Sequence, residues 1–138
     1  MTRLRRGYRG ADRLKELLES WRALKFDPDK CPVRSLLAQL GDKWTILVLI
    51  ILSEQPRRFS EIGREIPDIS KRMLTETLRE LERNGLVART VFPTKPPSVE
   101  YCLTDLGGSL LQPLVGLVVW ANENLDRVEA TRSQFDQA

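Results

Sequence analysis

The 138-residue sequence contains no histidine and only two cysteines. The missing histidine removes the commonest general base, the commonest zinc ligand and every serine or cysteine triad that depends on imidazole. The two cysteines, Cys31 and Cys102, form neither a CxxC pair nor a disulfide-dense framework, so a reducing cytoplasm is the expected location. Enzymatic function and metal binding are therefore disfavoured, and we expect no cofactor.

Long hydrophobic runs are also missing. The longest, Ile46 to Leu52, is far too short to span a bilayer, and the arginine-rich start leads into no apolar signal segment. The sequence therefore predicts neither secretion nor a membrane partner.

Charge is distributed unevenly along the chain. Hydrophobic residues make up 41% of the sequence and charged residues 30%, a composition typical of one globular domain. The net charge of +3 divides into +4 over residues 1–30, +2 over residues 31–104 and −3 over residues 105–138. The basic front and middle fit a polyanionic partner, whereas the acidic end indicates a different role for the C-terminal segment.

The first third of the chain shows helical periodicity. Residues 11–25 place five apolar side chains on one stripe, opposite the charges, which predicts an amphipathic helix before the break at Pro28. A short helix is expected from Pro32 to the terminator Gly41. Residues 43–56 are apolar on nearly all sides; this periodicity fits a buried strand as well as a buried helix, and only the helical neighbours favour the helix.

Two helices separated by a three-residue turn follow. The segment 59–66 predicts a short helix with Ser60 as its N-cap, stopped by Pro67. The segment 70–84 predicts a longer helix that begins at the N-cap Ser70 and ends at Asn84-Gly85.

The remaining sequence predicts a hairpin and a final helix. Two β-rich runs within residues 86–103 flank a proline-rich loop and predict a two-stranded wing. Thr104 can cap a helix over residues 104–127 with a wide apolar arc, in which Pro113 should cause a kink or mark a late start. Residues 128–138 are expected to be a frayed tail.

This order of elements is the plan of a winged helix-turn-helix. The expected fold is therefore mainly α with a small β-hairpin and with added N- and C-terminal helices, and double-stranded DNA is the expected partner. In the helix over residues 70–84, the core face carries Leu74, Leu78 and Leu81. The predicted DNA-contacting residues of this helix are Ser70, Lys71, Arg72, Thr75, Glu76 and Arg79.

Four further cations are candidates for contacts with the DNA backbone. These are Arg57, Arg58, Arg89 and Lys95, the last at the tip of the hairpin. For each residue alone, a solvated surface with salt-linked pairs explains the sequence equally well, and Arg89 could instead brace the wing.

The same residues carry a family resemblance. The motifs are Cys31-Pro32, Gly-Asp-Lys-Trp44-Thr, Arg58-Phe-Ser-Glu-Ile, Ile66-Pro-Asp-Ile-Ser-Lys-Arg-Met-Leu-Thr-Glu-Thr-Leu-Arg-Glu-Leu81 and Val99-Glu-Tyr-Cys-Leu-Thr-Asp-Leu-Gly107. Over residues 31–122, the chain resembles the HxlR-type transcriptional regulators. The resemblance implies a bacterial or archaeal regulator, usually a repressor, that binds a near-palindromic operator as a homodimer through its N- and C-terminal helices.

Several HxlR-type regulators respond to oxidants or electrophiles, and Cys31 matches the sensor cysteine of those members. Lys30, Arg34 and a helix N-terminus beside it would favour the thiolate. The alternative is a small buried residue that packs the dimer interface. Cys102 shares a strand face with Glu100 rather than with the inner residues. An oxidant or small-molecule effector is therefore one hypothesis.

Residues 1–30 exceed the resemblance and are expected to form a basic arm, with Arg3, Arg5, Arg6 and Arg9, and an amphipathic helix that packs on the C-terminal helix of the dimer. The alternative is a mobile tail. The predicted dimer-interface residues are Leu14, Leu17, Leu18, Trp21, Leu110, Leu114, Leu117, Trp120 and Ala121.

Three other functions remain as alternatives. A winged helix can serve as a protein-interaction module without DNA binding. A small redox enzyme using Cys31 is disfavoured by the missing histidine and by the lack of a glycine-rich cofactor loop. A metal sensor is weaker still, because two cysteines cannot complete a four-ligand zinc site.

Overall fold

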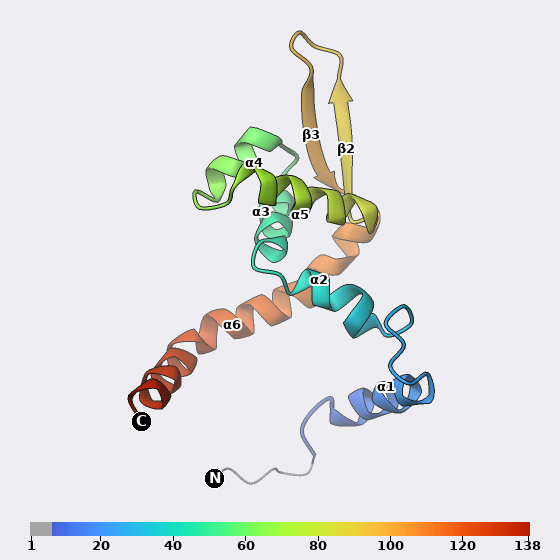
Figure 1. Cartoon of the computed structure of the whole chain (residues 1–138), viewed down its shortest axis with the longest axis vertical. Coiled ribbons are helices and arrows are strands. Elements are labelled where there is room, and N and C mark those ends of the chain that lie inside the picture. Colours follow the sequence, from blue (N-terminus) through green and yellow to red (C-terminus); the bar gives the residue numbers. More distant parts are fainter. Residues whose placement is uncertain (1–6) are drawn as a thin grey trace. The chain divides into compact units, whose positions relative to one another are not determined.

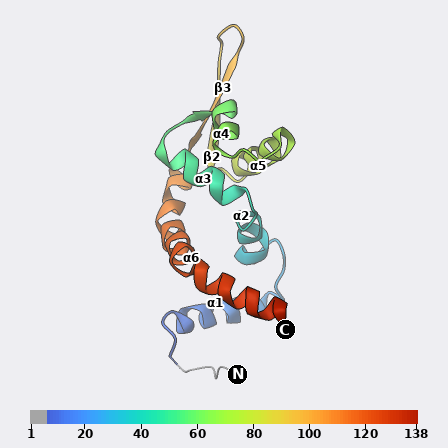
Figure 2. The ribbon, with the colours of Figure 1, turned by 90° about the vertical axis from the view of Figure 1, so that its left-hand side faces the viewer.

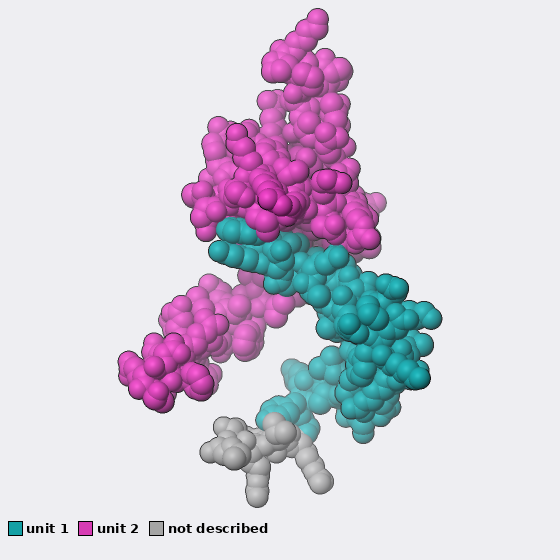
Figure 3. All heavy atoms as spheres, in the orientation of Figure 1, with its two compact units in different colours: residues 1–46 teal, residues 47–138 magenta. Residues whose placement is uncertain are grey.

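The computed structural model describes residues 7–138, so Arg3, Arg5 and Arg6 of the expected basic arm lie outside the described residues. The chain forms two compact units, residues 1–46 and 47–138 (Figure 3). The elements along the chain are labelled in Figure 1. In order they are α1 (Ala11–Ala23), η1 (Val33–Leu37), α2 (Ala38–Leu40), α3 (Thr45–Glu54), β1 (Arg57–Arg58), α4 (Phe59–Glu65), α5 (Lys71–Arg83), β2 (Val87–Phe92), β3 (Ser98–Leu103) and α6 (Asp105–Gln137).

The first unit is helical, as the periodicity predicts. Helix α1 contains no buried residue, so its leucine stripe is open to solvent in the single chain. The expected helix between Pro32 and Gly41 begins as the π-helical segment η1 and continues as α2, with Gly41 at the C-cap. A π-helical turn has one more residue per hydrogen-bonded ring than an α-helical turn. Apolar periodicity alone does not distinguish the two helix types.

The second unit is built around a hydrophobic core to which its helices and the strands β2 and β3 contribute. The apolar run at residues 45–54 is a helix, α3, and it buries Val48, Leu49 and Leu52. Other fully or nearly buried side chains come from α4, α5, the sheet and the residues that follow the two helices: Ile62, Ile66, Leu74, Leu78, Leu81, Leu86, Val87 and Tyr101. Each fully buried leucine or isoleucine stabilises the fold by about 1.5–3 kcal/mol relative to an exposed one.

The sheet confirms the predicted hairpin and adds one strand to it. β2 and β3 pair antiparallel, with Val87 opposite Leu103 and Phe92 opposite Ser98. The additional strand β1 pairs with the other edge of β3, giving the order β1-β3-β2. β1 has two arginines and is too short for alternation to be visible in the sequence. The fold is therefore mainly α with a small sheet, as predicted.

The start of α5 agrees with the sequence prediction, whereas the start of α4 differs from it. Ser70 is the N-cap of α5, and its Oγ accepts a hydrogen bond from the Met73 amide at 3.0 Å. The prediction of Ser60 as the N-cap of the preceding helix was wrong, because α4 begins at Phe59 and Arg58 occupies the cap position. There the Glu61 carboxylate accepts from the Arg58 amide at 2.9 Å, which satisfies one free donor without a serine cap.

Helix α6 is longer than the sequence indicates. It begins at Asp105 on the Thr104 cap and runs through Pro113 to Gln137, so neither the late start nor the frayed tail over residues 128–138 is found. Residues 114–137 contain one glycine and no further proline, so no strong helix breaker interrupts the course of α6. The helix is bent along its length (Figure 2).

The start of α6 is joined closely to the end of α5 and to the hairpin. The Thr104 hydroxyl donates to the Gly85 carbonyl at 2.5 Å and accepts from the Gly107 amide at 3.0 Å. Gly107 is buried, and a Cβ at this position would overlap the Leu86 carbonyl oxygen. The missing side chain therefore allows two backbones to meet at this junction.

Candidate DNA-binding surface

Helix α5 has two chemically different faces. One face buries Leu74, Leu78 and Leu81, as predicted, together with Thr77, whose burial the periodicity did not indicate. The exposed residues Lys71, Arg72, Thr75, Glu76 and Arg79 lie on the rest of the helix. The core contacts hold the backbone of α5 in place, so the polar side chains are presented outward from a fixed scaffold.

The N-terminus of α5 is exposed and capped. The amides in the first turn of a helix lack intrahelical acceptors, and together with the helix dipole they suit a phosphate oxygen. Ser70 satisfies only the Met73 amide, and Ser70 and Lys71 are both exposed. This end of α5 can therefore take part in backbone contacts with DNA.

Several of the exposed side chains on α5 have partners within the helix. Arg72 Nε lies 3.2 Å from Glu76 Oε1, and the Thr75 hydroxyl donates to the Lys71 carbonyl at 2.8 Å. The salt-linked surface considered for these residues is thus present for Arg72. Its side chain is 90% exposed, however, and an exposed ion pair contributes only about 0–1 kcal/mol, so the pair can open for a stronger acceptor.

The hairpin carries cations beyond the helices. It projects away from α3, α4 and α5, with Lys95 in the exposed loop between β2 and β3 (Figure 1). Arg89 is exposed on β2, opposite Tyr101 in the register, and Arg58 is exposed on β1. These three predicted cations are accessible to a phosphate backbone.

Arg57 is placed differently from the other predicted cations. Its side chain is only 14% exposed and its guanidinium forms ion pairs with Glu54 at 2.8 Å and Glu65 at 3.7 Å. Its Nε is buried without a hydrogen-bond partner in the described part of the chain. Arg57 thus links the ends of α3 and α4, and we no longer assign it to the DNA-contacting set.

The sequence did not single out the charged residues towards the C-terminal end of α5 as candidates for the DNA-binding surface. A shallow groove on the exposed face is lined by Glu76, Arg79, Glu80, Glu82 and Arg83, and Arg83 lies 3.5 Å from Glu80. The sequence signal was the continued charge run after Arg79, which is common on any solvated helix and therefore carries little information.

The two cysteines are free and differ in exposure. Cys31 is only 3% exposed and Cys102 is half-buried. No group of three or more metal-ligating side chains occurs among residues 7–138. Within the same range, no single helix is long and apolar enough to cross a membrane.

The residues predicted for a dimer interface are mostly open in the single chain. Leu14, Leu17, Leu117, Trp120 and Ala121 are exposed, and Leu18, Trp21 and Leu110 are half-buried. Leu114 is the exception: it is 9% exposed, so it already belongs to the core of one chain and offers little surface to a partner.

Comparison with known proteins gives consistent matches. The family model described as HxlR-like helix-turn-helix matches residues 39–129. The uncharacterised HTH-type transcriptional regulator YtfH of Escherichia coli is 37% identical over 106 residues, covering 77% of this chain and 84% of YtfH. Among solved structures, the transcriptional regulator ytfH from Salmonella typhimurium has a TM-score of 0.69 at 35% identity, covering 76% of this chain and 94% of that one. The redox regulator HypR in its reduced form has a TM-score of 0.68 at 38% identity, covering 72% and 98%.

Proposed function

The chain belongs to the HxlR-like helix-turn-helix family of DNA-binding transcriptional regulators, and from this premise we propose that it recognises a near-palindromic operator as a homodimer and represses transcription there. The observation that carries the proposal is the two-faced helix α5, with a leucine core face and an exposed face of polar and charged groups. In this arrangement α5 enters the major groove and the helix before it, α4, crosses the backbone.

Sequence discrimination is assigned to four exposed side chains of α5. Arg72 and Arg79 can each donate two hydrogen bonds to the O6 and N7 atoms of guanine, and the Thr75 methyl can contact the methyl of thymine. Each bidentate arginine contact discriminates between bases by about 1–3 kcal/mol. Glu76 holds Arg72 in the free protein and can accept from the N4 amino group of cytosine.

Affinity without sequence preference is assigned to the other cations. Lys71 at the start of α5, Arg58 and Arg89 on the sheet, and Lys95 in the hairpin loop are all exposed. Each cation that neutralises a phosphate releases counterions and makes the salt dependence of binding steeper.

Dimer formation is assigned to exposed apolar surface. Helix α1 presents Leu14 and Leu17, and α6 presents Leu117 and Trp120. Large apolar side chains grouped on an exposed helix face mark interaction sites more often than single scattered ones do. In a symmetric dimer, the two α5 helices would reach major grooves about 34–36 Å apart.

The test begins with selection of duplexes from a random pool by the purified full-length protein, which should return a sequence with two-fold symmetry. Binding to that duplex is then measured by fluorescence anisotropy at several salt concentrations. The double variant R72E/R79E should lose at least about a hundredfold in affinity, because repulsion replaces two contacts.

The matched control is R72K/R79K, which keeps both charges but removes the bidentate geometry. It should retain the salt slope and the affinity for random DNA while losing preference for the selected sequence. Equal binding of R72E/R79E and the parent protein to DNA would instead favour a protein-interaction module.

A second function, control by a thiol, is supported by the similarity to HypR, which is named a redox regulator. Cys31 is assigned as the responsive thiol. A quinone, which forms one C–S bond with a single thiolate, should lower operator affinity of the parent and of C102A but leave C31A unaffected. If only C102A lost the response, Cys102 would be the responsive thiol. If the quinone modified neither cysteine, this proposed function would be wrong.

A further inference from the structure

Arg57 has its backbone in the sheet and its side chain among the helices. Its backbone pairs with Tyr101 of β3, the strand that returns from the hairpin loop. Its guanidinium lies 2.8 Å from the Glu54 carboxylate at the end of α3 and 3.7 Å from the Glu65 carboxylate at the end of α4. All four residues belong to the compact unit of residues 47–138. One residue therefore joins the hairpin to two helices.

Helix α4 is attached to the sheet at both of its ends. At its start, β1 leads directly into α4, and the Glu61 carboxylate accepts a hydrogen bond from the Arg58 amide at 2.9 Å. At its end, the ion pair between Glu65 and Arg57 leads back to the same strand. A helix attached at one end can pivot, whereas attachment at both ends fixes its direction. Because a short turn after Glu65 leads into α5, the direction of α4 also sets where α5 begins.

Stability alone does not account for an arginine at this position. The buried Arg57 Nε has no hydrogen-bond partner in the described part of the chain, a cost that an apolar side chain of similar size would not carry. The buried side chains of Ile62 and Ile66 already hold α4 on the core, but apolar contacts are non-directional. The hydrogen bond from Arg57 Nη2 to Glu54 orients the planar guanidinium, so that Nη1 is held towards Glu65. The arginine thus adds a defined direction to α4.

We infer that Arg57 is a positioning residue for DNA recognition, which acts through Glu65 to hold α4 and α5 in a fixed orientation to the hairpin without contacting DNA itself. Sequence-specific binding requires the side chains of α5 and the cations of the hairpin to meet one duplex together. Binding to random DNA rests on phosphate contacts and tolerates shifts between these elements. The ion pair should therefore govern specificity more than general affinity. This inference rests on the proposed recognition of DNA by α5.

The decisive variant is Glu65→Gln in the full-length protein, because electrostatics and positioning predict opposite changes. Loss of a carboxylate reduces repulsion of phosphates, so electrostatics alone predicts slightly tighter binding to every duplex. Positioning predicts that the Kd for the selected duplex rises about fivefold or more, while the Kd for a random duplex stays within about twofold. Fluorescence anisotropy measures both constants.

The matched control is Glu129→Gln, which removes the same charge from α6. Glu129 is exposed and forms no ion pair among residues 7–138. Both dissociation constants should stay within about twofold of the parent values, because the charge is screened by solvent and salt.

A second experiment measures the coupling between the hairpin and α5 by adding Lys95→Ala to the parent and to E65Q. In the parent, loss of this exposed cation should raise the Kd for the selected duplex about three- to tenfold. In E65Q the same substitution should cost less than about twofold, because a hairpin that is no longer held in register contributes little. Lower stability of the fold would by itself leave the penalty for Lys95→Ala unchanged.

A variant that removes all three charges separates position from stability. In the triple variant E54Q/R57M/E65Q, an unbranched apolar side chain replaces the arginine and no carboxylate is left without its cation. The midpoint of urea denaturation should stay close to that of the parent, because an apolar replacement of a buried ion pair is often neutral. The Kd for the selected duplex should nevertheless remain raised by about fivefold or more.

Three results would overturn the inference. The first is a change in E65Q that is the same for the selected and the random duplex. The second is an equal penalty for Lys95→Ala in the parent and in E65Q. The third is parent-like affinity of the triple variant for the selected duplex. Failure of the proposed function would look different, because R72E/R79E would then bind DNA as well as the parent does.

Discussion

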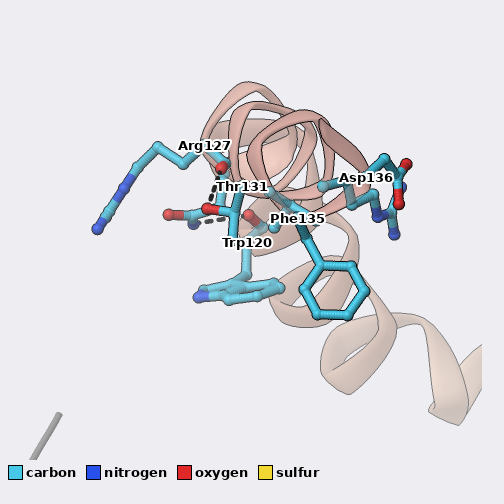
Figure 4. A pocket seen from close by; sticks show the side chains of 8 residues that line it. Trp120, Arg127, Thr131, Phe135 and Asp136 are labelled. Atoms are coloured by element: carbon cyan, nitrogen blue, oxygen red, sulfur yellow. Dashed lines mark hydrogen bonds between the residues drawn. The ribbon is translucent and has the colours of Figure 1, made fainter. Parts of the chain in front are cut away.

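The exposed face of α5 and the exposed apolar side of α6, which carries Leu117 and Trp120, belong to the same compact unit, yet they offer opposite chemistry to a partner. The α5 face presents charged side chains whose only ion pairs are exposed and weak, so it suits a polyanion that supplies many acceptors. The apolar side of α6 presents aromatic and aliphatic side chains, Trp120 among them (Figure 4), and suits another protein surface. The contrast shows that one small unit carries a charged surface and an apolar surface with different chemistry.

Substitution of Gly107 should have the largest effect and should disturb both α5 and α6, because Gly107 lies at the junction between α6 and the residues after α5. In Gly107→Ala, the added methyl would overlap the Leu86 carbonyl oxygen, and a backbone atom cannot move aside cheaply. We expect a loss of about 3 kcal/mol in the free energy of unfolding, measured by urea denaturation. Gly108→Ala is the matched control: its Cβ meets nothing within 4 Å, so helix propensity should stabilise the protein by up to about 1 kcal/mol.

The two neighbouring arginines of β1 test which side chains stabilise the fold and which contact DNA. Arg57→Ala removes the link between Glu54 and Glu65 and should lower the free energy of unfolding by about 1–3 kcal/mol, with little change in the salt slope of DNA binding. Arg58→Ala, at an exposed position, should leave stability within about 0.5 kcal/mol but reduce the salt slope by about 1. The reverse pattern would return Arg57 to the DNA-contacting set.

Substitutions of Ser70 separate its contribution to the stability of α5 from its contribution to phosphate binding. Ser70→Ala removes the cap of the Met73 amide and should destabilise the protein by about 1 kcal/mol in thermal denaturation. Ser70→Asp keeps a capping oxygen and should preserve stability, but its charge should repel the phosphate backbone and weaken DNA binding several-fold. Undiminished DNA affinity in Ser70→Asp would show that this helix end lies away from the backbone.

Glu76 should give the smallest effect and tests whether the charged face of α5 is poised for DNA. Glu76→Gln removes the ion pair of Arg72 at little cost, because the pair is exposed. Affinity for random duplex should rise about two- to fivefold at low salt, since one repulsive charge disappears beside the phosphates. The effect should be smaller at high salt; an increase that is independent of salt would point to a change in helix packing instead.

The sequence predicted the regions where local signals agree with the tertiary structure. For α5, the Ser70 cap, the leucine spacing and the Asn84-Gly85 end all indicate the same helix, and Gly85 adopts the positive φ of 75° that such an end requires. The hairpin was predictable for the same reason, because β-rich runs and a proline loop agree.

The features that the sequence did not predict depend on partners distant along the chain. β1 exists because its two residues meet Tyr101 and Glu100 of β3, and no periodicity records that pairing. The same pairing places Arg57 between two carboxylates, which a count of positive charges cannot distinguish from an exposed cation. The full length of α6 was missed because the last residues of a chain are expected to fray, although residues 114–137 contain no further proline that would stop the helix.

The junction at Thr104 and Gly107 fixes the N-terminal end of α6 to the residues that follow α5. A helix of 33 residues extends about 50 Å at 1.5 Å per residue. A tilt of only about 5° along that length moves one end by roughly 4 Å, more than the rise of one base pair. In the proposed dimer, small differences in how the two chains meet would therefore decide which half-site separations fit the two α5 helices.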